Sequence, residues 1–248
     1  MAVDEALLLA AEEGATTPTL RFYSWAQPTL SIGRLQQTDG LDYDYLDCEG
    51  IPVVRRPTGG RALLHDHELT YSVTLPAGAS LYGSLGEVYS RINAALLHAI
   101  GAFGVAPDQH DAPDNAGYSF SDACFATRLG HEISVDGRKM AAGAQRRLKR
   151  SAMQHGSILL TADVEQSLRC LAWPDPMQRR RAEDSMMGLC DLTGEGISAD
   201  QVADSVISAF AELYQIEFKA SSLSHEEEET ARMIAQRGER VTRHAGAV

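Results

Sequence analysis

The sequence predicts an α+β protein, with a mixed α+β domain over residues 1–175 and a small, mainly helical segment packed on it over residues 176–248. Short apolar segments with strand-like alternation are interleaved with two clear helices before residue 163. From Asp163 onward the pattern is mainly helical. The 248 residues are 44% hydrophobic and 23% charged, which is typical of a globular protein large enough for a sizeable core.

The first elements are a helix and a series of short strands. Met1 to Glu13 is expected to be helical, with acidic residues in its first turn and an apolar face of Val3, Ala6, Leu7 and Ala10. The predicted strands that follow are Leu20–Tyr23, Thr29–Ile32, Ile51–Arg55 and Leu69–Leu75. The last of these alternates strictly, which places four residues on one face: Leu69, Tyr71, Val73 and Leu75.

A second helix begins at a capping box, in which Ser84 precedes Glu87 by three residues. Its apolar stripe runs to Gly104 and comprises Val88, Ile92, Ala95, Leu96, Ala99 and Phe103. The polar stretch from Pro107 to Ser121 is expected to be a loop of unusual length. Beyond it, Asp136-Gly137 between two apolar segments predicts a type I′ hairpin.

The last elements are a strand and three helices. Ile158-Leu-Leu closes the final predicted strand. Helices are expected over Val164–Trp173, over Ser198–Tyr214 and from Ser224 onward, and the last two begin at capping boxes. The charged stretch Gln178–Ser185 is predicted to be a linker.

Composition and charge exclude several classes of function. The 22 Lys and Arg residues against 34 Asp and Glu give a formal charge of −12, which argues against a general nucleic-acid binder. No stretch approaches the roughly 20 apolar residues of a membrane-spanning helix. Because the N-terminus is acidic where a signal peptide is basic, we expect a cytoplasmic protein. The cysteines are far apart, so neither a structural metal site nor a disulfide framework is expected.

The first candidate site is the segment from Arg55 to Asp66, which contains Gly59, Gly60 and His65. Two glycines directly after a strand allow a sharp turn whose N–H groups approach a ligand. The arginines Arg55, Arg56 and Arg61 would neutralise a phosphate or carboxylate. The alternative is a plain β-turn with surface arginines.

The second candidate is the segment from Asp136 to Gln145, in which Lys139 precedes a run of small residues. Small residues suit a wall against which a ligand lies, and a lysine there could stabilise a developing negative charge. The alternative is a solvated lysine on a hairpin. Downstream, His155 lies at the mouth of an apolar strand, where a histidine is more often structural than catalytic.

The third candidate is Cys124, next to Phe125 at the end of the long loop. A cysteine nucleophile needs a cation or proton acceptor nearby, a role that Lys139 or His65 could fill if the fold brings them together. The alternative is a buried small hydrophobic residue, which we expect for Cys170 because it lies within a helical run.

Taken together, these motifs resemble the superfamily of lipoate–protein ligases, octanoyltransferases and biotin–protein ligases. The resemblance rests on six segments: Met1-Ala-Val-Asp-Glu-Ala-Leu-Leu, Arg21-Phe-Tyr-Ser-Trp, Leu30-Ser-Ile-Gly, Arg55 to Asp66, Asp136 to Gln145, and Gln154-His-Gly-Ser-Ile-Leu-Leu. The chain looks most like the cysteine-dependent octanoyltransferases that work with the glycine cleavage H protein. Gly59-Gly60-Arg61 stands where ligases show three glycines, and Cys124 falls where that group has its nucleophile.

The resemblance implies a central mixed sheet flanked by helices, the fold of biotin and lipoate protein ligases, with the acyl chain in an apolar tunnel. Cys124 would form a thioester with an octanoyl or lipoyl group and Lys139 would assist it, after which a lysine of a lipoyl domain takes the acyl group. Substrate binding would fall to Arg55, Arg56, Gly59, Gly60, Arg61, His65, Gly143, Ala144, Gln145, His155 and Gly156.

The same resemblance sets expectations for partners and cofactors. The donor would be an acyl carrier protein or the H protein, and the acceptors would be lipoyl domains of dehydrogenase complexes or the H protein. No metal or other cofactor, nucleic acid or membrane would be involved, and the enzyme would act as a monomer. A basic cluster could attract these acidic domains: Arg138, Lys139, Arg146, Arg147, Lys149 and Arg150. A solvated hairpin face explains the cluster equally well.

Two rival interpretations remain open from sequence. In an ATP-dependent lipoate–protein ligase, Lys139 would contact an acyl-adenylate, the arginines would bind phosphate, and ATP and Mg²⁺ would be required. Arg61 in place of a third glycine argues against this interpretation. A non-catalytic regulator would need a DNA-binding module, and the chain has neither a spare helix-turn-helix segment nor the necessary charge.

Overall fold

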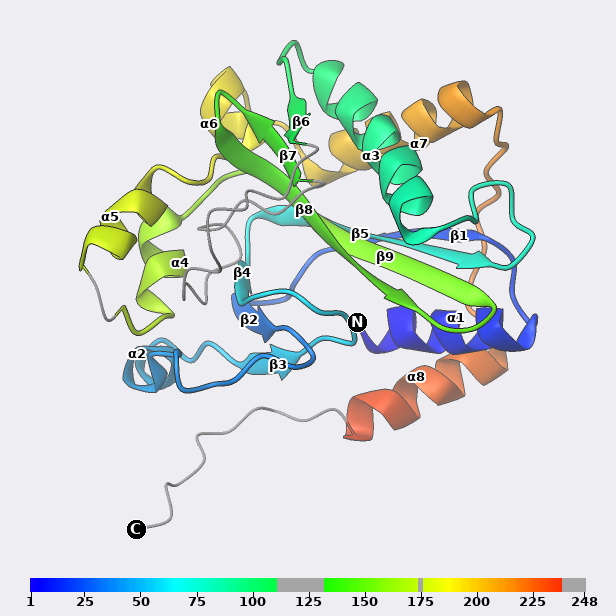
Figure 1. Cartoon of the computed structure of the whole chain (residues 1–248), viewed down its shortest axis with the longest axis horizontal. Helices are drawn as coiled ribbons and strands as arrows, with labels where there is room; N and C mark the ends of the chain where they lie inside the picture. The colour runs from blue at the N-terminus through cyan, green and yellow to red at the C-terminus, as the bar shows by residue number, and fades with distance from the viewer. Residues whose placement is uncertain (111–131, 174–175, 238–248) are drawn as a thin grey trace.

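The computed structural model describes residues 1–110, 132–173 and 176–237, and a six-stranded sheet lies at its centre (Figure 1). The strand order is β1-β5-β9-β8-β7-β6, and every pairing among these strands is antiparallel. Their bounds are β1 (Thr19–Tyr23), β5 (Glu68–Pro76), β6 (Asp108–His110), β7 (Glu132–Val135), β8 (Arg138–Arg147) and β9 (Ser151–Leu159).

In a second, three-stranded sheet of order β3-β2-β4, the strands β2 and β3 pair in parallel. It consists of β2 (Thr29–Ile32), β3 (Val53–Arg55) and β4 (Leu63–His65), with α2 (Tyr43–Cys48) between β2 and β3 in the chain. A separate core forms around this sheet and includes the buried Leu30, Ile32, Leu46 and Cys170. Cys170 is therefore the core residue that its helical context predicted.

One face of the large sheet packs against α3 (Leu85–Gly101) and α7 (Ala199–Tyr214), forming the main hydrophobic core. The predicted faces of β5 and of the second helix meet there, as Tyr71, Val73, Ile92 and Leu96 show. Both helices begin at the predicted capping boxes, which satisfy backbone N–H groups of their first turns. The helix α7 supplies Val202, Val206 and Phe210 to this core. This packing does not test the domain boundary predicted at residue 175, which stays a prediction.

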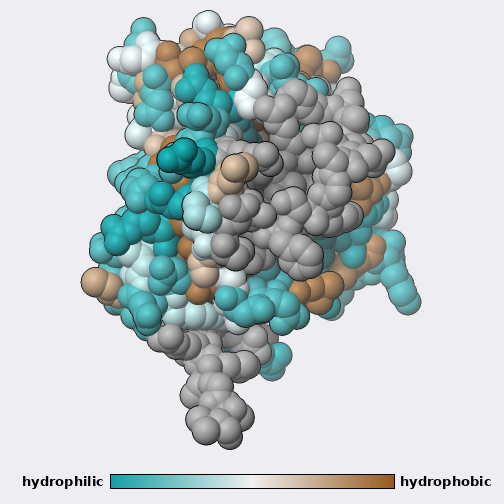
Figure 2. All heavy atoms as spheres, turned by 60° about the vertical axis from the view of Figure 1, so that its left-hand side comes forward, coloured by the Kyte–Doolittle hydropathy of each residue, from teal (hydrophilic) through white to brown (hydrophobic). Residues whose placement is uncertain are grey.

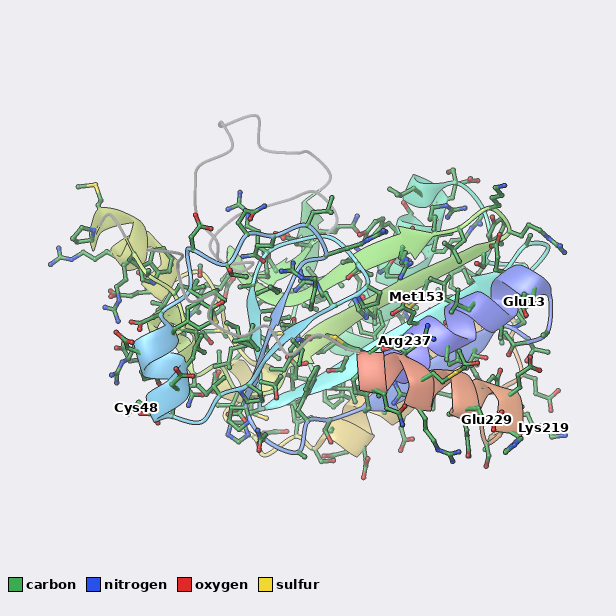
Figure 3. The ribbon with its side chains drawn as sticks, turned by 90° about the horizontal axis from the view of Figure 1, so that it is seen from below. Glu13, Cys48, Met153, Lys219, Glu229 and Arg237 are labelled. Carbon is green, nitrogen blue, oxygen red and sulfur yellow. The ribbon has the colours of Figure 1, made fainter. Side chains whose placement is uncertain are left out.

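The other face of the sheet is covered by α1 (Ala2–Glu13), and α8 (His225–Arg237) lies alongside α1 (Figure 3). The face predicted for the first helix is only partly right. Ala6 and Leu7 are buried as expected, whereas Val3 and Ala10 are half-buried. The buried set also includes Asp4, Leu8 and Ala11, because α1 packs on two sides, against the sheet and against α8.

Three short helices connect β9 to α7: α4 (Val164–Arg169), α5 (Pro176–Glu183) and α6 (Leu189–Thr193). The linker predicted over Gln178–Ser185 is wrong, since most of it is α5. Proline is favourable at the first position of this helix. Arg179 pairs with Glu165 on α4 and with Glu183 one turn away, which ties a strongly polar helix to the fold.

The hairpin predicted at Asp136-Gly137 is confirmed. Both residues have positive φ, 50° for Asp136 and 75° for Gly137, as a type I′ turn requires. Within the described residues no helix is long and apolar enough to cross a membrane. Figure 2 shows a face on which hydrophilic side chains predominate and hydrophobic ones form scattered patches. The expected α+β fold, a sheet flanked by helices with further helices at the C-terminal end, is confirmed.

Candidate active site

The face of the large sheet turned away from α3 carries buried polar and small side chains instead of an apolar layer. In β5, Glu68 and Thr70 alternate with the core residues Leu69 and Tyr71, so they point to this opposite face. The register places Thr70 beside Ser157 and places two alanines of β8 beside β9 residues, in the pairs Ala142–Ser157 and Ala144–His155. This face is the candidate site. Small side chains of β8 lie on it, and their role as a wall against a ligand stays a prediction.

The Gly59–Gly60 loop is built around the guanidinium of Arg56, which is 6% exposed. Arg56 donates hydrogen bonds to the carbonyl oxygens of Ser31, Gly59 and Arg61 and to the Ser31 hydroxyl, at 2.7–3.3 Å. Charge-assisted hydrogen bonds of this kind fix a loop firmly. The structure therefore shows Arg56 organising the loop, while its predicted contact with a substrate anion stays a prediction.

Arg55 organises the neighbouring turn in the same way. Its Nη1 donates to the carbonyl oxygens of Gly33, Arg34 and Gln36. The turn packs directly on the Gly-Gly loop, because a Cβ placed on Gly33 would lie 1.9 Å from the Gly60 carbonyl oxygen. Gly60 has a φ of +97°, in the region that favours glycine. The backbones of the two segments thus contact each other directly.

His65 joins the small sheet to the large one. Its Nε2 lies 2.7 Å from the Ser31 Oγ and its Nδ1 lies 2.7 Å from the Glu68 Oε1. The Trp25 ring stacks on the imidazole with centroids 4.3 Å apart. His65 therefore helps to anchor the Gly-Gly loop, since the Ser31 Oγ that it contacts also accepts a hydrogen bond from Arg56.

Glu68 is the centre of that network. Its Oε1 accepts hydrogen bonds from Thr70 at 2.5 Å and from Ser157 at 2.6 Å, in addition to the His65 contact. Burial alone would raise the pKa of Glu68, but His65 and the two hydroxyl donors outweigh it and hold the pKa below its ordinary value. The carboxylate is therefore charged in the neutral pH range.

His155 forms the second polar contact between the loop and the large sheet. Its Nε2 lies 2.7 Å from the Thr58 Oγ1, and its Nδ1 lies 3.8 Å from Asp4 Oδ2 on α1. Burial lowers the pKa of His155, and the Asp4 carboxylate offsets this only partly. The imidazole is therefore neutral near pH 7.

Asp4 is a site residue that sequence reasoning missed, since it was read only as an acid in the first turn of a helix. Its side chain is fully buried and accepts hydrogen bonds from Arg21 and from Tyr23, each at 2.8 Å. Burial would raise its pKa, but His155, Arg21 and the chain's first amino group outweigh burial and hold the pKa far below its ordinary value. The sequence does contain an indication that Asp4 is buried, because Asp4 shares a helical face with Leu7 and Leu8.

Lys139 is 3% exposed, so the alternative of a solvated hairpin lysine is wrong. Its Nζ donates to the Glu132 Oε1 at 2.5 Å, and Glu132 is itself buried. Glu132 was also missed from sequence. The basic cluster does not form one patch, since Arg146 and Arg147 lie at the other end of β8, about 23 Å along the strand. Those two arginines contact Glu5 and the Gly83 carbonyl oxygen respectively.

Other predicted site residues face the core side of the sheet. Gly143 and Gly156 are paired, and a Cβ on either would lie 2.7 Å from the Tyr71 hydroxyl. The Gln145 Nε2 donates to the Gln154 Oε1 and to the Leu85 carbonyl oxygen on α3. The structure thus brings Lys139, Ala144, His155, His65 and the Gly-Gly loop to the site side, but not the side chain of Gln145.

Cys124 lies outside the described residues. Of the other cysteines, Cys48 is exposed on α2, far from α1 and α8 (Figure 3), and Cys190 donates to the Ile197 carbonyl oxygen. Burial raises the pKa of the Cys170 thiol to about 12, so it is not a nucleophile near neutral pH. In the described part of the chain, no group of histidine, cysteine and acidic side chains is arranged to hold a metal ion.

Comparison with known proteins matches residues 1–211 to the lipoyl protein ligase A/B catalytic domain. The chain is 39% identical to the octanoyltransferase LipM of Kyrpidia tusciae, over 94% of this chain and 89% of that protein. It is 36% identical to the LipM of Moorella thermoacetica, over 92% and 86% of the two chains.

The fold is also similar to solved structures. A lipoate-protein ligase A bound with ATP superposes with a TM-score of 0.78 at 24% identity, covering 95% of this chain and 88% of that one. A bipartite lipoate protein ligase from Thermoplasma acidophilum gives 0.76 at 22% identity, with the same coverage. At these identities the likeness shows a shared fold.

Proposed function

Because the chain belongs to the lipoyl protein ligase A/B catalytic domain family, we propose that it is an acyltransferase that transfers an octanoyl group to a lysine of a lipoyl domain. The observation that carries the proposal is the 39% identity to an octanoyltransferase over almost the whole chain. The polar face of the sheet supports it, since a buried lysine lies there beside small side chains.

In the proposed reaction the thiolate of Cys124 attacks the carbonyl carbon of an octanoyl thioester. A C–S bond forms to the enzyme while the C–S bond to the donor breaks, and the donor sulfur leaves as a thiolate that takes a proton from solvent. The neutral amine of the acceptor lysine then attacks the acyl-enzyme, giving the amide and releasing the Cys124 thiolate. The proton lost by the amine passes to that thiolate or to solvent.

Both steps pass through a tetrahedral oxyanion, for which Lys139 is the proposed electrostatic partner. A preorganised cation at such a position lowers the barrier because it is already oriented when charge develops. The buried position of Lys139 supports this role, since the interaction is stronger where water is excluded.

The donor in this proposal is an octanoyl group already activated as a thioester, on an acyl carrier protein or on the glycine cleavage H protein. The acceptor is a lipoyl domain, of a dehydrogenase complex or of the H protein. Because the acyl group arrives as a thioester, neither ATP nor Mg²⁺ is required. The loop-building role of Arg56 agrees with this, since its guanidinium is engaged by carbonyl oxygens.

An acyl-transfer assay tests the proposal with the intact mass of an apo lipoyl domain as readout. One reaction supplies an octanoyl-carrier donor without nucleotide, and the other supplies free octanoate with ATP and Mg²⁺. We expect modification only in the first reaction, and its loss in Cys124→Ser. Modification only in the second reaction, unchanged in Cys124→Ser, would make the protein a ligase.

A further inference from the structure

The ion pair between Lys139 and Glu132 joins two neighbouring strands inside the protein. Lys139 is 3% exposed and Glu132 is 7% exposed, and the Nζ–Oε1 distance is 2.5 Å. A buried charge is costly unless a partner compensates it. Each side chain therefore compensates the buried charge of the other, which favours a fixed position for both.

The backbone aims both side chains at the same face of the sheet. Ile133 and Val135 of β7, and Met140 and Ala141 of β8, all contribute to the core on the α3 side. Two consecutive core residues in one strand break the normal alternation, and the register between β7 and β8 shifts at that place. Such an irregularity re-aims side chains, and here it turns Lys139 toward the face that Glu132 occupies.

The backbone of Lys139 is also held by hydrogen bonds to the segment before α6. Its N–H donates to the Ser185 carbonyl oxygen at 2.8 Å, and its own carbonyl oxygen accepts from the Met187 N–H at 3.1 Å. The lysine thus has a fixed backbone, and the remaining freedom lies in the torsions of its long side chain. Glu132 acts on the end of that side chain.

We propose that Glu132 is a positioning residue that holds the Lys139 ammonium at the place where the acyl-transfer oxyanion forms. This inference rests on the proposed function, since it gives the carboxylate a role in that same reaction. A displacement of about 1 Å in a catalytic group can cost about 10²-fold in rate. A carboxylate at hydrogen-bond distance prevents such displacement without contacting the substrate.

The test measures kcat and KM for octanoyl transfer from a carrier thioester to an apo lipoyl domain. Glu132→Asp keeps the negative charge, but the side chain is shorter by one methylene, so the carboxylate lies farther from the Lys139 Nζ. We expect kcat to fall at least about 10-fold and KM to stay within about 2-fold, with the thermal midpoint near that of the wild type. If Glu132→Asp retains kcat within about 2-fold, the carboxylate does not position Lys139 and the inference fails.

A double-mutant cycle separates positioning from a general structural role. Glu132→Gln is compared with Lys139→Gln and with the double variant Glu132→Gln/Lys139→Gln, which removes both members of the ion pair. If Glu132 acts through Lys139, adding Glu132→Gln to Lys139→Gln lowers kcat no further. A further loss of about 10-fold or more in the double variant, with folding intact, would overturn the inference.

Glu165→Gln is the matched control, because it removes one carboxylate from an exposed pair with Arg179. Its kcat and KM should equal those of the wild type. The wild-type measurement separates the two proposals. A wild type without carrier-dependent transfer refutes the proposed function, whereas an active wild type with an equally active Glu132→Asp refutes only the role of Glu132.

Discussion

Thr58 and His155 are separated by 97 residues, yet the Thr58 Oγ1 and the His155 Nε2 lie 2.7 Å apart inside the protein. Thr58 belongs to the turn before the Gly-Gly loop, and His155 belongs to the central strand β9. This contact fixes the distance between the loop and the wall of the site. Since His155 is neutral near pH 7, the hydroxyl donates to Nε2 when Nδ1 carries the proton and faces Asp4.

Replacing Thr58 by Val keeps the shape of the side chain and removes the donor. We expect the free energy of unfolding to fall by about 1–3 kcal/mol, because the buried imidazole nitrogen loses its partner. Thr58→Ser keeps the hydroxyl and should cost less than half as much. Urea unfolding of the three proteins measures this, and equal stability of Thr58→Val and the wild type would contradict the account.

Arg56→Lys tests whether the guanidinium builds the Gly-Gly loop. A lysine ammonium cannot reach the oxygens of Ser31, Gly59 and Arg61 together, because it lacks the planar fork of arginine. We predict a loss of about 3 kcal/mol in unfolding free energy, with a matching loss of transfer activity. Arg180→Lys, on an exposed position of α5, is the control and should change neither quantity.

Gly33→Ala tests the backbone contact between the two loops. The added Cβ would lie 1.9 Å from the Gly60 carbonyl oxygen, so one loop must move. We expect destabilisation by more than about 2 kcal/mol and a clear fall in activity. Gly86→Ala is the control, since it lies in α3 with nothing within 4 Å of the new atom. It should be neutral or stabilising by up to about 1 kcal/mol.

The buried polar network predicts that stability falls as the pH is lowered from 7 to 4. The pKa of His155 is lowered in the folded protein, so below about pH 6.5 the unfolded chain binds a proton that the folded one does not. The pKa of Glu68 is also lowered, which adds a second loss below about pH 4.5. Each of these pKa differences favours the unfolded state as the pH falls, because the unfolded chain binds the proton more readily.

Urea unfolding at pH 7.5, 6, 5 and 4 measures this dependence. His155→Gln should weaken the slope between pH 7 and 5.5 while leaving the slope below pH 5 in place. Comparing how steeply the unfolding free energy changes with pH separates the titration of His155 from any pH-independent loss of stability that the substitution causes. A wild-type stability that rises as the pH is lowered from 7 to 5 would contradict the account, as would an unchanged slope in His155→Gln.

Local features were predictable because nearby residues decide them. Ser84 and Glu87 cap a helix through their own side chains, and Asp136-Gly137 adopts positive φ within two residues. The strictly alternating pattern of Leu69–Leu75 likewise shows which residues face α3. In each case the information lies within one turn or one strand.

The polar network was not predictable in this way, because sheet register decides it. Nothing near Arg56 in the sequence shows that its guanidinium meets Ser31, which lies 25 residues earlier. The burial of Lys139 depends on the register shift between β7 and β8, which alternation alone does not reveal. The helix α5 was missed since its polar composition lacks an apolar face, and its partners on α4 come from tertiary contact.

The most direct test of the central claim is whether the enzyme carries the acyl group on Cys124. Wild type, Cys124→Ala and Cys190→Ser are incubated with an octanoyl-carrier donor and no acceptor, and their intact masses are measured. The account predicts one hydroxylamine-labile octanoyl adduct in the wild type and in Cys190→Ser, and none in Cys124→Ala. An adduct that persists in Cys124→Ala, or transfer to a lipoyl domain at the wild-type rate by that variant, would contradict it.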